Sequence, residues 1–581
     1  MGISSLSTTQ ISNLSPAAIQ NLSVTDISSL SASQIGAINT SGIAVISATQ
    51  LGALNATQIR GLTTTQIPEL AGSVVFSASQ LMALNAQQFA SLTETQLDNF
   101  DSTRVGAISV TQLSAMSATN FGSLDSTQIG LLTATQLRGM TTAHVQGLTT
   151  DDMSEFTATQ LGLFSTQQVG ALNATQLGAL STTQLAGMTG TQLGLLSNAN
   201  LAALDSAQMA SLTSTQLAGL KSTQISALST TDLGELTATQ IGALNRTQML
   251  SLTATQIGAL TADQTAGITT TQVSALTAQQ VGALSETSAA ALTTTQLAAL
   301  SAGQVAQINA ATLSALDATQ IGSLTATQAR GLTTTQLSAM SAEDFGELTA
   351  TQIGGLTTTQ FRSLNATKIS ALDATQSAGL TTTQIMSLTA AQIGGLDATD
   401  VGDLTTTQIA AFSAAQIGQL SETSFSALNG TQVGALSAAQ IRGVTTTQIA
   451  GLQAADIEEF TTTQITSLTA TQVSAFTTTN INALSTTQLG AFSASQIGAL
   501  NATNLAALDA NQMAALTATQ IRGLTTTQLV NLSSTDLGEL TSTQIGALTR
   551  TQTVALTATQ ISALDATQSA GLTTTQIQGL T

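Results

Sequence analysis

The chain has 581 residues, of which 42% are hydrophobic, 7% charged and 2% aromatic, and its formal net charge is −19 at pH 7. This acidic balance argues against nucleic acid and anionic membrane surfaces as partners, because both attract clustered cations. The sequence holds no cysteine and one histidine, and no apolar run approaches eighteen residues. Thiol catalysis, zinc, copper or haem sites of ordinary composition and membrane spans are therefore excluded.

An apolar residue recurs at every eighth position from Phe76 to Leu580, sixty-four times without insertion or deletion. We call the eight-residue unit an octad and number it from this residue, so that a typical octad reads L-[S/T/N/D]-[A/T]-T-Q-[I/L/V]-[G/S/A]-[A/G]. Repetition at a short fixed period is typical of solenoids, in which each unit packs on its neighbours. The repeat therefore predicts a solenoid rather than the three or four globular domains that the length alone suggests.

Residues 1–70 carry the octad in a first register, with Leu6 and Leu70 at position 1. The spacing from Leu70 to Phe76 is six residues instead of eight, and Pro68 lies just before the change. We interpret it as a two-residue deletion absorbed as a kink; a hinge or binding feature is the alternative. The predicted organisation is a solenoid over 1–70, a register slip at 71–75 and a continuous solenoid over 76–581.

Four signals place the start of a short helix in each octad. Position 2 is Ser, Thr, Asn or Asp, the strong N-caps, at sixty-two of sixty-four sites, with Lys221 and Gln453 as exceptions. Position 5 is Gln at forty-seven of sixty-three sites, which completes a capping box. Pro16 sits at a first helical position. Positions 1 and 6 form a hydrophobic staple, diluted at Thr265, Ala289, Ala329, Ser377, Thr553 and Ser569.

The predicted fold class is all-α: a solenoid of short capped helices, one per eight-residue repeat. An unbroken helix does not fit, because eight residues rotate by about 800° and the apolar positions would drift around the helix. Small residues at positions 7 and 8 would let neighbouring backbones approach closely. The alternative is a β-solenoid, suggested by Thr triplets such as residues 63–65. Against it, positions 1 and 6 would point to opposite faces of one strand.

The charges hint at a longer period. Four arginines at position 7 are each followed fourteen residues later by Asp at position 5, and seventeen residues later by Glu. Both spacings bracket sixteen residues, so a turn of two octads would bring these charges together as ion pairs. Duplication of a larger block is the alternative explanation. The residues are Arg138, Arg330, Arg442 and Arg522, with Asp152, Asp344, Asp456 and Asp536, and Glu155, Glu347, Glu459 and Glu539.

No pattern in the sequence predicts catalysis, so we expect no enzyme and no catalytic, cofactor or metal site. His144 replaces Gln at position 5 and is interpreted as a structural variant. The densest carboxylates, Asp151 with Asp152 and Glu458 with Glu459, are interpreted as a solvated edge. Neither a calcium-binding loop nor a glycine-rich phosphate loop is present.

The units L-T-A-T-Q-I-G-A-L (residues 252–260) and L-T-T-T-Q-I-A-A-F (residues 404–412) resemble repeat regions of very large bacterial surface or adhesin-like proteins. The resemblance covers essentially the whole chain. It implies an extracellular structural role: an elongated spacer, a stalk or a self-assembling filament subunit, outside or on a bacterial cell, although no signal peptide is visible. The alternative function is a flat Thr/Gln surface, made by positions 3, 4 and 5, that binds ice, a glycan or another regular lattice.

Self-association is the partner that the sequence favours. The first octad, from Leu6, and the last full octad, from Leu572, look like interior units, with Ile11 and Ile577 at position 6. Solenoid ends without polar caps can stack head to tail into open fibres. We therefore expect end-to-end association, with no nucleic acid partner and no membrane insertion, while a glycan or surface ligand stays unidentified.

Overall fold

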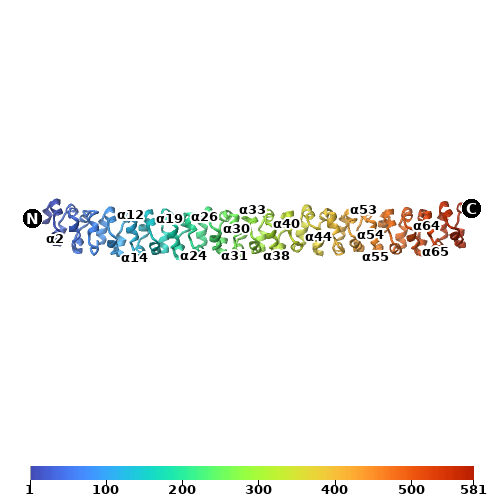
Figure 1. Ribbon diagram of the computed structural model, residues 1–581, viewed down its shortest axis with the longest axis horizontal. Coiled ribbons are helices and arrows are strands. Elements are labelled where there is room, and N and C mark those ends of the chain that lie inside the picture. The colour runs from blue at the N-terminus through green and yellow to red at the C-terminus, as the bar shows by residue number, and fades with distance from the viewer. Residues whose placement is uncertain (1, 581) are drawn as a thin grey trace. The chain divides into compact units, whose positions relative to one another are not determined.

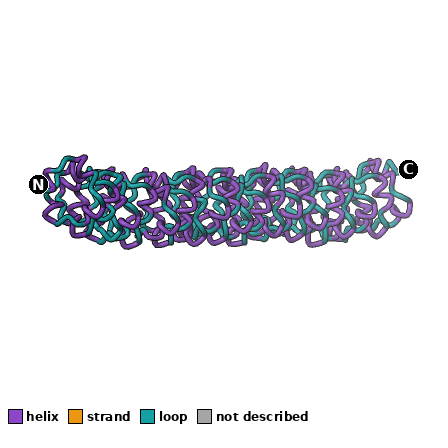
Figure 2. Tube along the Cα trace, turned by 60° about the vertical axis from the view of Figure 1, so that its left-hand side comes forward, coloured by secondary structure: helices purple, strands orange, loops and turns teal. Residues whose placement is uncertain are grey.

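The computed structural model describes residues 2–580 and divides into two compact units, Met1–Leu292 and Thr293–Thr581. Within residues 2–580 every regular element is a helix, so the all-α prediction is confirmed and the β-solenoid alternative is wrong. The α-helices are four to six residues long, and each begins at position 3 of an octad, from α1 (Thr8–Ser12) to α70 (Thr574–Ile577). Short helices alternate with loops throughout each unit (Figure 2).

The capping box starts these helices as the sequence predicts. Before α12 (Val110–Ala115), Ser109 Oγ accepts the backbone N–H of Gln112 at 3.2 Å, and Gln112 Oε1 accepts that of Ser109 at 2.9 Å. Where Lys221 stands at the cap, its side chain accepts no such bond, but Gln224 Oε1 still accepts the N–H of Lys221 at 2.7 Å. One half of the box therefore suffices to begin a helix that the surrounding turns hold in place.

The chain changes direction at positions 1 and 2 of the octad. After α12, Met116 and Ser117 are both extended, with φ/ψ of −59°/152° and −69°/156°. No residue in the described part of the chain has a positive φ, so the corners need no left-handed glycine. Two extended residues between helices are thus enough to turn each octad into one side of a larger ring.

Three octads complete a turn. In unit 1, α9 (Ala86–Ala90) packs on α12, and in unit 2, α39 (Ala326–Gly331) packs on α42 (Ala350–Gly355), in each case the third helix along. Within each unit, these three-octad turns follow one another in one direction (Figure 1). The hypothesis of two octads per turn is wrong. Three sides enclose an interior that receives the side chains at positions 1, 5 and 6 of most octads.

Positions 1 and 6 form the apolar core. Leu113 is fully buried and Met116 is 5% exposed, and most residues at these two positions are likewise buried. Thr265 and Thr553, which dilute position 6, are also buried, and each Oγ1 donates to a backbone carbonyl four residues earlier. Positions 2, 3 and 4 mostly face solvent. The core therefore accepts occasional hydroxyls because the helix itself satisfies them.

The register slip leaves the stacking of turns unbroken. Pro68 lies in the 3-10 helix η2 (Ile67–Glu69), and residues 71–75 form a turn without a helix of their own. The next helix, α8 (Ala78–Ala83), packs on α7 (Ala56–Ile59), so the short segment replaces one side of a turn. The turn is two residues shorter than its neighbours, and the three-sided arrangement continues beyond it.

Some glycines at position 8 mark places where two backbones touch. A Cβ atom added to Gly187 would lie 2.0 Å from the carbonyl oxygen of Ala158, in the preceding turn. A Cβ atom added to Gly219 would lie 2.2 Å from the carbonyl carbon of Gly190. By contrast, nothing lies within 4 Å of a Cβ added to Gly170, at position 7. Only some of the small residues are therefore required by packing.

Replacing Gly187 by Ala should destabilise unit 1 by about 1–3 kcal/mol, because backbone atoms cannot move aside for the added methyl group. The matched change Gly170→Ala should be neutral or stabilising by up to about 1 kcal/mol, because Ala favours the helix. Chemical denaturation of the two variants measures both effects. Equal stabilities would show that the turns do not approach as closely as described.

Candidate functional site

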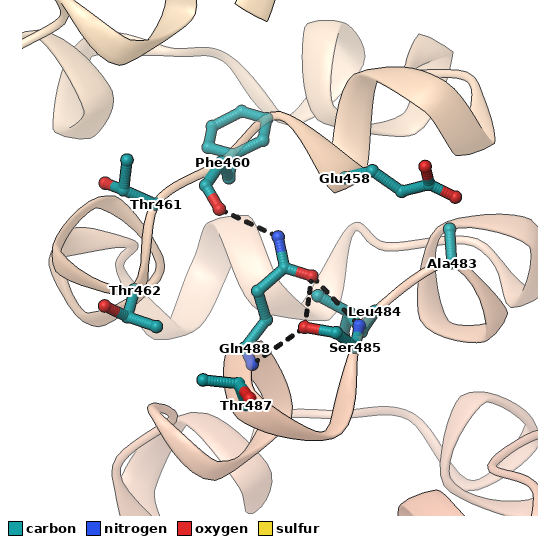
Figure 3. A pocket seen from close by; sticks show the side chains of 9 residues that line it. All are labelled: Glu458, Phe460, Thr461, Thr462, Ala483, Leu484, Ser485, Thr487 and Gln488. Carbon is teal, nitrogen blue, oxygen red and sulfur yellow. Dashed lines mark hydrogen bonds between the residues drawn. The ribbon is translucent and has the colours of Figure 1, made fainter.

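The glutamine at position 5 joins each turn to the one before it, and Figure 3 shows one case, Gln488. Its Oε1 accepts the N–H of Ser485 at 2.9 Å within the capping box. Its Nε2 donates to the carbonyl oxygens of Phe460 at 2.8 Å and Ile457 at 2.9 Å, which belong to the preceding turn. These acceptors lie 28 and 31 residues earlier, and the same pair of spacings recurs along both units. We call this set of bonds the inter-turn ladder.

The ladder also crosses the register slip. Gln80 donates to Leu51 and Leu54, at spacings of 29 and 26 residues, and Gln96 donates to Ile67 and Leu70 at the same spacings. From Gln112 onward the spacings return to 31 and 28. The two missing residues thus shorten one turn without removing its ladder bonds.

Most residues that replace Gln at position 5 keep a donor for the ladder. Asn120 Nδ2 donates to the Leu92 carbonyl at 2.7 Å, and Ser424 Oγ donates to that of Leu396, also at 2.7 Å. Lys368 is 4% exposed and its Nζ donates to the Leu337 carbonyl at 2.8 Å; burial lowers its pKa below the usual lysine value. Position 5 therefore requires a donor more strictly than it requires an amide.

His144 is such a replacement. Its Nδ1 accepts the N–H of Thr141 at 3.2 Å, and its Nε2 lies 2.9 Å from the Met116 carbonyl, 28 residues earlier. The ring is 1% exposed and stacks on Phe121 with centroids 5.0 Å apart, and burial lowers the pKa of the imidazole. Nδ1 completes the capping box and Nε2 makes the ladder contact, so His144 makes both of the contacts that a glutamine makes at this position.

Aspartates at position 5 do not supply the donor that the ladder requires. The Asp152 carboxylate accepts the N–H of Thr149 at 2.7 Å, as Gln would, but an ionised carboxylate has no proton to donate to the preceding turn. Two aspartates instead accept hydrogen bonds from serine hydroxyls of that turn, Asp400 from Ser370 at 2.7 Å and Asp456 from Ser426. At these octads the ladder is interrupted.

Five of these aspartates are followed by Glu at position 8, and the Oε2 atom of each Glu is buried without a hydrogen-bond partner in the described chain. Burial, followed by the nearby Asp152, Asp125 and Asp151, raises the pKa of Glu155 above its usual value. The pKa values of the other four are raised by burial first as well. Sequence reasoning missed the Asp232–Glu235 member, although the shared D-x-x-E signal could have identified it. The glutamates are Glu155, Glu235, Glu347, Glu459 and Glu539.

The predicted ion pairs with position-7 arginines are wrong. Arg138, Arg330, Arg442 and Arg522 are exposed, and the ion pair found among residues 2–580 joins Arg104 to Asp101 within α11 (Ser102–Ala107) and its N-cap. Side chains stack when they are three octads apart, so partners separated by nearly two octads lie on different sides of the turn. Hydrogen bonds from Arg104 are the main reason that the pKa of Asp101 is lowered.

Open grooves run between stacked octads at the surface. The groove in Figure 3 has a volume of about 640 Å³ and is lined by residues of successive turns, including Thr461, Thr462 and Thr487. No three His, Asp or Glu side chains of the described chain are arranged to hold a metal ion. Within residues 2–580 no helix is long and apolar enough to span a bilayer.

One side of unit 2 carries a run of threonines. Four consecutive stacked helices each begin within a Thr-Thr-Thr triplet: α40 (Thr334–Ala339), α43 (Thr358–Arg362), α46 (Thr382–Ser387) and α49 (Thr406–Ala411). We call the twelve residues of these triplets the threonine face; they are exposed or half-buried. Their position-5 glutamines are buried, so glutamine is not part of any exposed surface there.

Comparisons with known proteins match two segments of the repeat. A family model described as the ALTTAQ repeat matches residues 449–486 and 513–550. Together with the regular helices, this match shows a repeat protein with a helical solenoid fold. No curated protein matches the chain.

Among solved structures, the chain is similar to the leucine-rich repeat-containing protein LegL7 from Legionella pneumophila. The identity is 14%, the match covers 47% of this chain and 79% of that one, and the TM-score is 0.11. So low a TM-score gives no support to a shared fold or function.

Proposed function

We propose that the protein is a non-enzymatic structural element, an elongated spacer or stalk on or outside a bacterial cell that also assembles into filaments. The observation that carries this proposal is the inter-turn ladder. It repeats the same hydrogen bonds from turn to turn in each unit. The buried glutamine side chains therefore hold successive turns of the solenoid together. The resemblance of the octads to repeats of large bacterial surface proteins supports the location.

The ladder also supports self-association. The Nε2 donors always point to the preceding turn, so one side of each turn presents donors and the other side presents carbonyl acceptors. Opposite sides of any two turns are therefore complementary, as head-to-tail assembly requires. The net charge of −19 opposes lateral clumping and binding to nucleic acid.

Small-angle scattering over a dilution series tests this proposal. Each unit holds about twelve turns of three octads and so extends for about 100–120 Å at the usual spacing of packed helices. We expect a radius of gyration well above the value of about 25 Å for a compact globule of this length. It should rise with concentration as copies stack.

Ile577→Glu is a suitable control for the association, because this side chain is 51% exposed, whereas Ile11 is fully buried. The charged variant should keep the radius of gyration of the dilute protein and lose its rise with concentration. The radius of a compact globule at high dilution would contradict the spacer, and a radius independent of concentration would contradict assembly.

The threonine face favours a second function, binding to a regular lattice such as ice. Eight hydroxyls, those at positions 3 and 4 of its triplets, have no hydrogen-bond partner in the described part of unit 2, and β-branched side chains are held in few rotamers. All thirteen phenylalanines are buried, so no aromatic ring is exposed to stack on a sugar. Ice is therefore favoured over a glycan. The residues are Thr334, Thr335, Thr358, Thr359, Thr382, Thr383, Thr406 and Thr407.

If the threonine face binds ice, the intact chain should depress freezing below melting, and Thr359→Lys with Thr383→Lys should abolish the effect by placing bulky charges in the array. The matched control is Thr351→Lys with Thr375→Lys, which changes the same octad position on another side of the turn. No freezing hysteresis in the unmodified protein, or equal loss in both double variants, rules this function out.

A further inference from the structure

Five octads combine an interrupted ladder with a buried carboxylate oxygen. We propose that these D-x-x-E octads are acid-tightened layers: each is a weak contact between turns at neutral pH, and protonation of its buried glutamate strengthens it. The inference concerns the fold and does not depend on the proposed spacer function. The five are residues 148–155 and 228–235 in unit 1, and 340–347, 452–459 and 532–539 in unit 2.

The missing donor is the first part of the argument. No hydrogen bond from α17 (Thr150–Glu155) reaches the Leu124 carbonyl, which is the equivalent acceptor for Asp152 in the preceding turn. Length does not explain this, because Asn120, whose side chain is equally short, spans the same spacing to Leu92 at 2.7 Å. The difference is the proton. The Asn120 amide has N–H groups to donate, whereas an ionised carboxylate has none.

The concentration of negative charge is the second part. Glu155 faces Asp151 and Asp152 of its own helix and Asp125 at the N-cap of α14 (Ser126–Gly130), which packs on α17 from the preceding turn. No lysine or arginine of the described chain pairs with this group. Like charges held together with a buried, unpartnered Oε2 weaken the contact between the two turns.

The arrangement recurs in full in three of the other four octads and in part in the fourth. Three of them have an aspartate N-cap in the preceding turn, and the fourth, with Glu459, has Gly430 N–H there instead. The buried Oε2 therefore recurs in all five octads, and the facing aspartate of the preceding turn recurs in four of them. The facing groups are Asp232 and Asp205 for Glu235; Asp344, Glu343 and Asp317 for Glu347; Asp456 for Glu459; and Asp536 and Asp509 for Glu539.

The direction of the pH effect follows from the raised pKa of the five glutamates. The folded chain takes up protons at a higher pH than the unfolded chain, whose glutamate pKa is near 4.5. Stability therefore rises as the pH falls from neutral through the raised pKa, and the gain is complete below about 4.5. This is opposite to the usual loss of stability for carboxylates that are paired with cations.

Hydrogen exchange of the full chain, measured at pH 7.5 and pH 5.0 and corrected for intrinsic rates, tests the proposal layer by layer. Amide protection should rise on acidification in the D-x-x-E octads, by up to about tenfold per pH unit within the titration. Octads with Gln at position 5, such as α42, should change less. The octads to follow contain α17, α27 (Thr230–Gly234), α41 (Ala342–Gly346), α55 (Ala454–Glu458) and α65 (Ser534–Gly538).

Acidification could also stabilise the fold by reducing general repulsion among its negative charges, and two sets of variants distinguish this effect from the proposal. Changing the five glutamates to Gln should remove the rise on acidification, and changing their position-5 aspartates to Asn should increase protection already at pH 7.5. Five exposed carboxylates, changed to the corresponding amides with the same shift in net charge, should leave the rise intact. The control positions are Glu94, Asp98, Asp263, Glu286 and Glu422.

The proposal is overturned if the control set abolishes the rise as completely as the glutamate set, because general repulsion would then be its cause. It is also overturned if the D-x-x-E octads gain no more protection on acidification than their Gln neighbours. A rise confined to these five octads, and lost only in the glutamate set, supports it.

Discussion

One buried side-chain amide per octad sets the architecture. The position-5 glutamine closes the capping box of its own helix with Oε1 and bonds the preceding turn with Nε2. A helix of four to six residues does not persist alone in water, so it depends on such contacts. Because each donor reaches carbonyl groups at the corner just before the third helix preceding its own, these bonds also require three octads in every turn.

Other features follow from this constraint. Replacements at position 5 are tolerated where a donor remains, as with His144 and Lys368, and the register slip is tolerated because Gln80 reaches its acceptors at shorter spacings. Position 6 can lose apolar bulk, as at Ser377, because the ladder uses the backbone carbonyl of this residue and not its side chain. The aspartate octads are the exceptions: they keep the helix start but lose the bond between turns.

Local structure could be predicted from the sequence, and stacking could not. Capping signals at positions 2 and 5 predict the first residue of each helix, because these signals act within one octad. The number of octads per turn depends on contacts between residues of different turns, which no local signal encodes. The spacing of Arg138 and Asp152 suggested two octads per turn, whereas the structure has three. The hydrogen bonds from glutamine to the preceding turn were also missed, because the capping box alone already explains why Gln recurs at position 5. The family match and the fold establish a helical repeat protein, and its cellular role stays a proposal.

The central claim, that glutamine bonds one turn to the next, is tested most directly at Gln488. Glu at this position keeps the acceptor for Ser485 but replaces the donor that serves Phe460 and Ile457 by a charged oxygen, whereas Asn keeps a donor, as Asn480 does with Leu452 at 2.7 Å. Urea denaturation at pH 7.5 measures the difference. The account predicts a loss of about 1–3 kcal/mol for Gln488→Glu and a clearly smaller one for Gln488→Asn. Equal stability of the Glu variant and the unmodified protein would contradict it.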